Sequence, residues 1–344
     1  MRKILVLFTM ITLTTCWVSC SDNEDEEIPP VEEETPADNS QEDTVIYKVI
    51  MEAEISDATP VKIEVKGKGN KKANLKIDWG DNQTSSDLFI IEKEHQYRKV
   101  GLYTITLTGN DITSLSISGP FTSLNTSQCT CLEELDVSST NPISVDVSKN
   151  TNLTSLDCSG NQLASLDVSN NHELRNLYCS DNLLTSLDLS NNHELRRLFC
   201  QQNQLTSLDV SNCNKLIHVF CENNQLVALD VSNKQELQYL ACGMNKLTSL
   251  NLDNTTKIEH LNCVGNLLTT LDLSTNVKLR EVNIIENSFS GEALNYLFHT
   301  LPLVYDGSAR IDINGGSACD KSIATARGWQ VEEYYPNPRD IKHL

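Results

Sequence analysis

The sequence predicts a mainly β solenoid, preceded by a small β-sandwich and closed by a small α/β C-terminal cap. A fixed step of 21 residues decides this, because one apolar column recurs at that spacing at Leu153, Leu174, Leu195, Leu216, Leu237, Ile258 and Leu279. Three further columns keep the same step and begin at Leu156, Cys158 and Asn161. A short, constant period is typical of stacked coils that bury their apolar faces against one another.

Each repeat matches the leucine-rich-repeat pattern, as in Leu174-x-x-Leu177-x-Cys179-x-x-Asn182-x-Leu184-x-x-Leu187-x-Leu189. The 21-residue form with a cysteine column resembles the repeats of internalin-J-type bacterial surface proteins. This resemblance covers Ile112 to Phe289 and implies a parallel sheet on a concave face. We assign residues 111–289 to the solenoid, with 111–131 and 132–152 as degenerate coils, because Pro142 and Val145 stand where later coils carry leucine.

The cysteine column raises the question of whether the coils bind a metal or have a redox function. It comprises Cys158, Cys179, Cys200, Cys221, Cys242 and Cys263. We expect buried free thiols and no cofactor, because these residues occupy an inward position where related repeats place leucine. Parallel side chains one coil apart lie too far apart for a disulfide. A row of metal sites or a redox wire is the alternative, although no CxxC pair or neighbouring histidine completes a site. The pairing of four other cysteines stays open: Cys129, Cys131, Cys213 and Cys319.

Two polar columns are also expected to be structural. The asparagine column should hydrogen bond to backbone groups where the chain turns. The second column stacks carboxylates at Asp146, Asp167, Asp188, Asp209, Asp230, Asn251 and Asp272. Like charges at this spacing repel unless compensated, so we expect neighbouring Ser and Thr hydroxyls to hydrogen bond to them. A row of bound cations is the alternative.

Residues 1–19 are expected to be a lipoprotein signal peptide, with Arg2 and Lys3 ahead of an apolar stretch too short to span a membrane. Val18-Ser19-Cys20 resembles the lipobox of bacterial lipoproteins, which implies that Cys20 is lipidated. Trp17 departs from the leucine usual in such boxes. Cys16 is a weaker candidate, and a plain secreted protein with a free cysteine is the alternative.

Residues 20–43 are expected to form a disordered, self-repelling tether, because Ser21 to Asp43 holds no Lys or Arg but many acidic residues. The run that starts at Cys20 resembles the acidic surface-export signal of Bacteroidota-type bacteria. It implies a lipid-anchored protein of the outer membrane that faces the cell exterior, with a plain solvated spacer as the alternative. The net charge of −20 argues against nucleic-acid partners.

Residues 44–110 are expected to be a β-sandwich with strands at Val45–Met51, Val61–Val65, Leu75–Trp79, Leu88–Ile91 and Tyr103–Thr108. The run Asp78-Trp79-Gly80-Asp81-Asn82, followed by a second motif that begins at His95, resembles the immunoglobulin-like PKD domain. Asn82 stands where that domain usually has glycine. The resemblance implies a spacer, with direct glycan or protein binding as the alternative.

Residues 290–344 are expected to cap the solenoid. Ser290 should cap a helix that Pro302 stops, a strand should follow at Arg310–Asn314, and a helical turn at Ser322–Arg327. The segment Leu294–Trp329 resembles the C-terminal segment that closes related repeat proteins.

No catalytic motif is recognisable, so we expect a binding protein and not an enzyme. His172-Glu173 and His193-Glu194 begin like the zinc motif HExxH, but Asn176 and Arg197 occupy the second histidine position. There is no phosphate loop, nucleophile elbow or Rossmann glycine run either.

The binding site is expected on the concave sheet, where strand alternation turns the residues between the column residues outward. Reading along the coils, the predicted site comprises Tyr178, Phe199 and Phe220, flanked by Arg197, His218, Tyr239 and His260. Exposed aromatics and arginine are enriched at protein interfaces, so we expect a protein partner, in adhesion or scaffolding. The alternatives are that the rings merely stack as a cross-strand ladder, or that the protein is an outer-membrane accessory that binds glycans or has a structural role.

Overall fold

The computed structural model describes residues 45–56, 59–69, 72–140, 144–305, 309–315 and 318–335, and places them in one compact unit, Thr44–Leu344. The expected signal peptide, Cys20 and the acidic tether lie outside the described residues. Among the residues described, none of the helices has the length and apolar character needed to cross a bilayer.

The N-terminal part is a β-sandwich whose alternate residues point into one core, as Val49, Met51 and Ala53 do. One sheet has the order β4 (Thr84–Asp87), β3 (Leu75–Asp78), β6 (Gly101–Gly109), β1 (Tyr47–Ile55) and β8 (Phe121–Gln128). The other is formed by β7 (Ile112–Ser118), β2 (Val61–Gly67) and β5 (Ile90–His95). The strand expected at Leu88–Ile91 starts only at Ile90, in β5, because Leu88 and Phe89 lie in the turn between β4 and β5.

The expectation of a degenerate coil at residues 111–131 was wrong. These residues form β7 and β8, which lie in different sheets of the sandwich: β8 pairs with β1, and β7 pairs antiparallel with β2. Strand β7 also pairs parallel with β9 (Glu134–Asp136), and Leu115 lies opposite Leu135. Strand β7 keeps the 21-residue register of the repeats, so its sequence resembles that of a coil. The residues that follow it form β8, which belongs to the sandwich.

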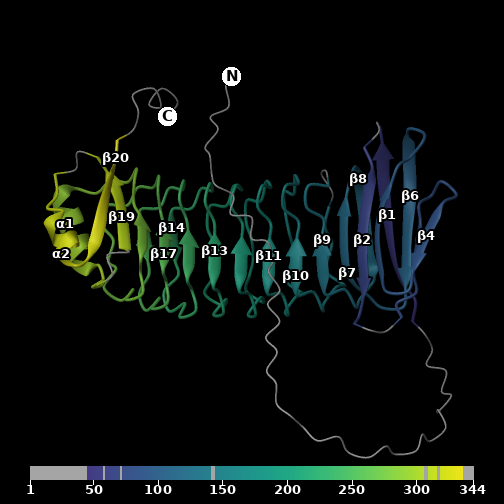
Figure 1. Ribbon diagram of the computed structural model, residues 1–344, viewed down its shortest axis with the longest axis horizontal. Helices are drawn as coiled ribbons and strands as arrows, with labels where there is room; N and C mark the ends of the chain where they lie inside the picture. Colours follow the sequence, from purple (N-terminus) through teal and green to yellow (C-terminus); the bar gives the residue numbers. More distant parts are fainter. Residues whose placement is uncertain are drawn as a thin grey trace, which may run out of the picture. The chain divides into compact units, whose positions relative to one another are not determined.

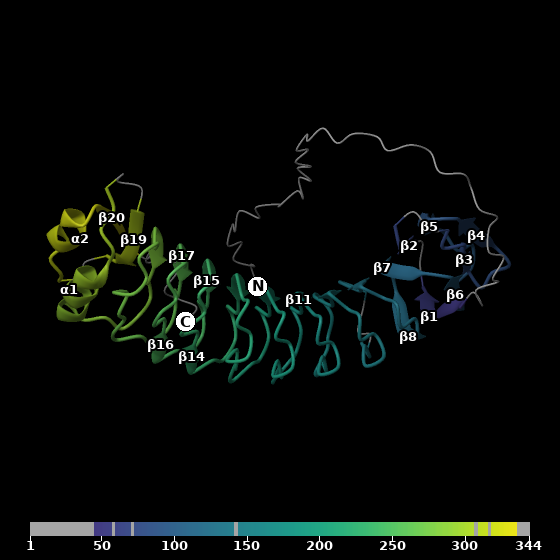
Figure 2. The same ribbon diagram turned by 90° about the horizontal axis from the view of Figure 1, so that it is seen from below.

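The following residues form a solenoid with a parallel sheet that runs along its inner, concave side (Figures 1 and 2). Each strand pairs with the residues one repeat further on, as Leu177 does with Leu198. The strands after β9 are β10 (Ser155–Asp157), β11 (Asn176–Tyr178), β12 (Arg197–Phe199), β13 (His218–Phe220), β15 (Tyr239–Ala241), β17 (His260–Asn262) and β18 (Glu281–Asn283). A short parallel pair, β14 (Ala228–Asp230) and β16 (Ser249–Asn251), lies on the opposite, outer side (Figure 2).

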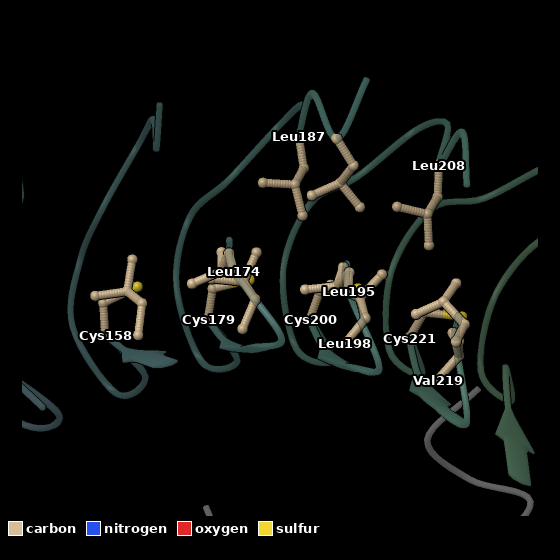
Figure 3. Close-up of a cluster of buried hydrophobic side chains, with 14 of the residues drawn as sticks. Cys158, Leu174, Cys179, Leu187, Leu195, Leu198, Cys200, Leu208, Val219 and Cys221 are labelled. Carbon is tan, nitrogen blue, oxygen red and sulfur yellow. The ribbon is translucent and has the colours of Figure 1, made fainter. Parts of the chain in front are cut away.

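The cysteine ladder lies inside the coils, beside leucine side chains from successive repeats (Figure 3). All six thiols are free and buried, as predicted. Burial raises the pKa of Cys158, Cys200 and Cys263 to about 12. The ladder is therefore part of the hydrophobic core and holds thiols, not reactive thiolates, at neutral pH.

The C-terminal cap extends the parallel sheet. Helix α1 (Gly291–Thr300) starts at the expected cap, where Ser290 Oγ accepts a hydrogen bond from the amide of Ala293 at 3.1 Å. Strand β19 (Ala309–Asn314) then pairs parallel with β18, and α2 (Ser322–Ala326) leads into β20 (Trp329–Tyr334). Sequence reasoning missed β20, which pairs with β19 and forms the last strand of the sheet.

Candidate binding surface on the parallel sheet

The predicted asparagine column holds the coils in register. Asn182 Nδ2 donates to the carbonyl oxygens of Cys158 at 3.0 Å and Cys179 at 3.2 Å, while its Oδ1 accepts from the amide of Leu163 at 3.0 Å. The same pattern recurs at Asn203, Asn224, Asn245, Asn266 and Asn287. Each amide thus joins two coils through buried hydrogen bonds, which fixes the spacing of the strands.

A second buried column, which sequence reasoning missed, lies on another turn of the coil. Its members are Asn150, Asn171, Asn192, Cys213, Lys234, Thr255 and Asn276, and all are buried. Asn192 Nδ2 donates to the carbonyls of Val168 and Asn171, and Lys234 Nζ reaches that of Ser211 at 2.8 Å. Cys213 thus belongs to this column and faces the carbonyl of Leu189. The feature of the sequence that could have revealed this column is its 21-residue spacing.

The aspartate column is compensated locally. Asp188 Oδ1 accepts from the backbone amide of Ser190 at 2.9 Å, in addition to the serine hydroxyl that the sequence suggested. These hydrogen bonds, first the backbone one, lower the pKa of Asp188. An equivalent hydrogen bond, from the backbone amide two residues further along the chain, is accepted by Asp146, Asp167, Asp209, Asp230, Asn251 and Asp272. The column therefore needs no cations to be accommodated.

On the concave sheet, the predicted aromatic residues form one continuous ladder of rings. The ring centroids of Tyr178 and Phe199 lie 5.0 Å apart edge to face, and those of Phe199 and Phe220 lie 4.4 Å apart. The ladder then steps diagonally to Tyr239, whose ring stacks on Phe220 at 4.9 Å, and on to His260 at 5.3 Å. We call these five residues the ring ladder.

The rings are less exposed than the sequence predicted. Tyr178, Phe199 and Phe220 are half-buried, because each ring leans against the next instead of standing free in solvent. Ala241, the strand partner of Phe220, is fully buried, and its small side chain leaves room for Phe220 to reach Tyr239. The stacking that the sequence offered as an alternative is therefore present.

The polar neighbours of the ring ladder are distributed unevenly. Arg197 is exposed and its Nη1 donates to Asn176 Oδ1 at 3.1 Å. Partial burial, and then the nearby Arg197, lower the pKa of His218. At the far end, His260 Nδ1 lies 3.0 Å from Glu281 Oε2. The middle of the ladder thus carries an exposed guanidinium, while the ring at its end is hydrogen bonded to Glu281.

A third row on the same face was missed by sequence reasoning. It follows the cysteine in each repeat and includes Gln201 and Glu222 beside the rings. Gln201 Oε1 and Glu222 Oε2 are buried yet accept no hydrogen bond from the protein. Such orphan acceptors cost stability unless water or a ligand donates to them. Burial raises the pKa of Glu222 to about 7.

The raised pKa of Glu222 predicts a pH-dependent stability. The unfolded side chain titrates near its ordinary value of 4.5, so the folded protein binds more protons between pH 4.5 and about 7, and stability falls as pH rises through that window. Glu222→Gln should remove this loss and raise the free energy of unfolding by about 1–3 kcal/mol at pH 8. Urea titrations at pH 4, 6 and 8 measure it, with the exposed Glu259→Gln as control. If the free energy of unfolding changed equally with pH in wild type and in Glu222→Gln, the raised pKa of Glu222 would be contradicted.

The described residues contain no group of three or more His, Cys, Asp or Glu side chains placed to hold a metal ion. The surface of the sheet instead offers ring edges, a guanidinium and unpaired acceptors. This chemistry suits reversible binding of a polar, donor-rich surface.

Comparison with solved structures identifies the class of fold. The functional domain of InlJ from Listeria monocytogenes, which includes a cysteine ladder, is similar with 28% identity and a TM-score of 0.50, over 68% of this chain and 55% of that chain. An internalin, InlF, from the same organism matches with 20% identity over 61% and 70% of the two chains, and a TM-score of 0.46. The leucine-rich effector YopM from Yersinia pestis matches with 23% identity over 56% and 54%, and a TM-score of 0.39.

The protein is thus a mainly β, leucine-rich-repeat solenoid, as the sequence predicted. The chain spans little more than half the length of the InlJ domain that it resembles. No protein-family model and no curated protein sequence matches it.

Proposed function

We propose that this protein is a non-catalytic binding module that holds a protein partner, in adhesion or scaffolding, against the ring ladder on its concave sheet. The observation that carries the proposal is the row of half-buried rings beside two buried acceptors without protein partners. Half-buried rings are already ordered, so docking against them costs little further side-chain entropy. Similarity to a cysteine-ladder domain of InlJ supports a binding role.

The geometry favours protein over glycan as the ligand. A sugar stacks on a free, flat aromatic face, but Phe220 and Tyr239 lie nearly parallel at 8° and use a face of each ring against the other. Tyr178 and Phe199 meet edge to face at 87°. The surface therefore offers edges and small apolar patches, which suit the mixed side chains of a protein.

The test is to replace Phe199 and Phe220 with alanine together. A pull-down from host extracellular proteins, run beside a glycan array, first supplies a ligand. The double variant should weaken its binding by at least about tenfold, because central aromatic contacts commonly contribute 2 kcal/mol or more. Leu183→Ala with Val227→Ala is the matched control, since both side chains are exposed and lie outside the parallel sheet. An affinity within about twofold of the parent excludes the ring ladder as the site, and glycan-only binding excludes the protein partner.

We further propose that Cys20 carries a lipid that anchors the protein to the outer membrane, with the solenoid facing the cell exterior. The support is the lipobox-like Val18-Ser19-Cys20 with acidic residues directly behind it. In this arrangement the PKD-like β-sandwich is a spacer between tether and solenoid. Cys20→Ala should release the protein from intact cells, as measured by a membrane-impermeant label. Unchanged surface attachment would exclude the anchor.

A further inference from the structure

Two cysteines outside the ladder lie together where the sandwich meets the first coil. Cys129 Sγ and Cys131 Sγ lie 3.5 and 3.1 Å from one atom, the carbonyl oxygen of Ile112 in β7. The two thiols also hydrogen bond to each other. They are therefore neighbours in space, unlike the ladder thiols, which succeed one another a whole coil apart.

The backbone between them suits a covalent bond. The amide of Leu132 donates to the carbonyl of Cys129 at 3.3 Å, so residues 129–132 form a tight turn. Consecutive Cα atoms are about 3.8 Å apart, so the Cα atoms of Cys129 and Cys131 cannot be more than about 7.6 Å apart. The range of roughly 4.4–6.8 Å that protein disulfides occupy lies within that limit.

The two thiols have different surroundings. Cys129 is completely buried, whereas Cys131 is partly exposed and lines a surface hollow with Lys68, Asp111 and Glu133. The hydrogen bond from Cys129 lowers the pKa of Cys131 and raises that of Cys129. An accessible thiol with a lowered pKa next to a buried partner is the usual division between an attacking and a resolving cysteine.

We propose that Cys129 and Cys131 are an oxidisable dithiol, in which Cys131 attacks low-molecular-weight disulfides and Cys129 resolves the product. Cys131 as thiolate attacks one sulfur of the small disulfide, forms a mixed disulfide and expels one small thiolate. Cys129 then loses its proton to that thiolate and attacks Cys131 Sγ, and the second small thiolate leaves. The pair gives up two electrons to the small disulfide, which ends as one thiol and one thiolate, and a Cys129–Cys131 disulfide forms.

The other cysteines of the described chain provide internal controls. The six ladder thiols are buried and burial raises the pKa of each one, so they should not react in the folded protein. Cys213 is buried in the second polar column. Cys319 is partly exposed but has no thiol beside it in the described structure, so it can form a mixed disulfide and not an internal one.

The experiment treats the folded, full-length chain with oxidised glutathione and maps each cysteine by peptide mass spectrometry. Wild type should yield a peptide in which Cys129 and Cys131 are joined, with the loss of two hydrogens in mass and no retained glutathione. Cys129→Ser should trap glutathione on Cys131, and Cys131→Ser should leave Cys129 unmodified. Cys319→Ser is the matched control and should behave as wild type at the pair.

Two outcomes would overturn the proposal. One is wild-type Cys131 that stays unmodified while Cys319 reacts, and the other is a mixed disulfide on Cys131 that persists with Cys129 present. The wild-type map requires no variant to fold, and circular dichroism checks that each variant does. Retention of a soft metal ion by the reduced pair, with no disulfide formed, would also count against it.

Discussion

Asn203→Ala should lower the free energy of unfolding by about 3–5 kcal/mol, because it removes three buried hydrogen bonds, two of which join neighbouring coils. Asn203 Nδ2 donates to the carbonyls of Cys179 at 2.9 Å and Cys200 at 3.1 Å, and Oδ1 accepts from the amide of Leu184 at 3.0 Å. Alanine supplies none of these groups. The two carbonyl groups and the amide that Asn203 binds would then lack a hydrogen-bond partner or would bind a water molecule inside the coil.

Urea unfolding followed by circular dichroism measures this loss. Asn212→Ala is the matched control, since Asn212 is exposed and one turn of the same coil away. The control should change stability by less than about 0.5 kcal/mol, as surface substitutions commonly do. A loss below about 1 kcal/mol at Asn203 would mean that the column is not what holds the coils together.

Trp329→Ala should destabilise the C-terminal end by about 3–5 kcal/mol, because it empties the centre of the cap. Trp329 is 1% exposed and its Nε1 donates to the carbonyl of Pro302 at 2.8 Å. It lies opposite Ala309 at the start of the β19–β20 pair. Without it, the last coil loses its cover, and repeat proteins unfold from an uncovered end.

Hydrogen exchange locates this effect. The amide of Ile284, which donates to Asp312 of β19, should exchange much faster in Trp329→Ala, while that of Cys179 near the middle should change little. Trp329→Phe keeps most of the ring volume and loses only the Nε1 bond, so it should cost far less. Uniform acceleration along the whole chain would contradict a local cap and indicate one cooperative unit.

Most of the coil architecture could be predicted from sequence because each inward position repeats at one fixed step. A leucine, cysteine or asparagine in a column has the same neighbours in every coil, so the pattern states the contacts directly. In the sandwich, the expected strands correspond to β1, β2, β3 and β6, whereas β4 and β8 were not predicted. The β7–β8 segment could not be distinguished from a coil, because Leu115 satisfies the solenoid register and the sandwich core together.

The candidate site was predicted less completely. The rings were found because they recur on the outward positions, but their burial depends on diagonal contacts such as Phe220 to Tyr239, which no single column contains. Glu222 and Gln201 were missed because polar residues in an outward row are ordinarily solvated. Lys234 was missed for a related reason, since a lysine rarely occupies a buried position among asparagines.

The sheet that continues from β2 through β7 to β20, and is parallel from β7 onward, has a mechanical consequence. Its strands lie across the long axis, so its hydrogen bonds run along that axis and the coils are connected in series (Figure 1). Tension applied between the two ends loads every interface between coils equally and opens the weakest one first. Each coil that peels away releases 21 residues, or up to about 70 Å of chain. A solenoid of this kind lengthens in steps under load, and the coils that remain closed keep their binding face intact.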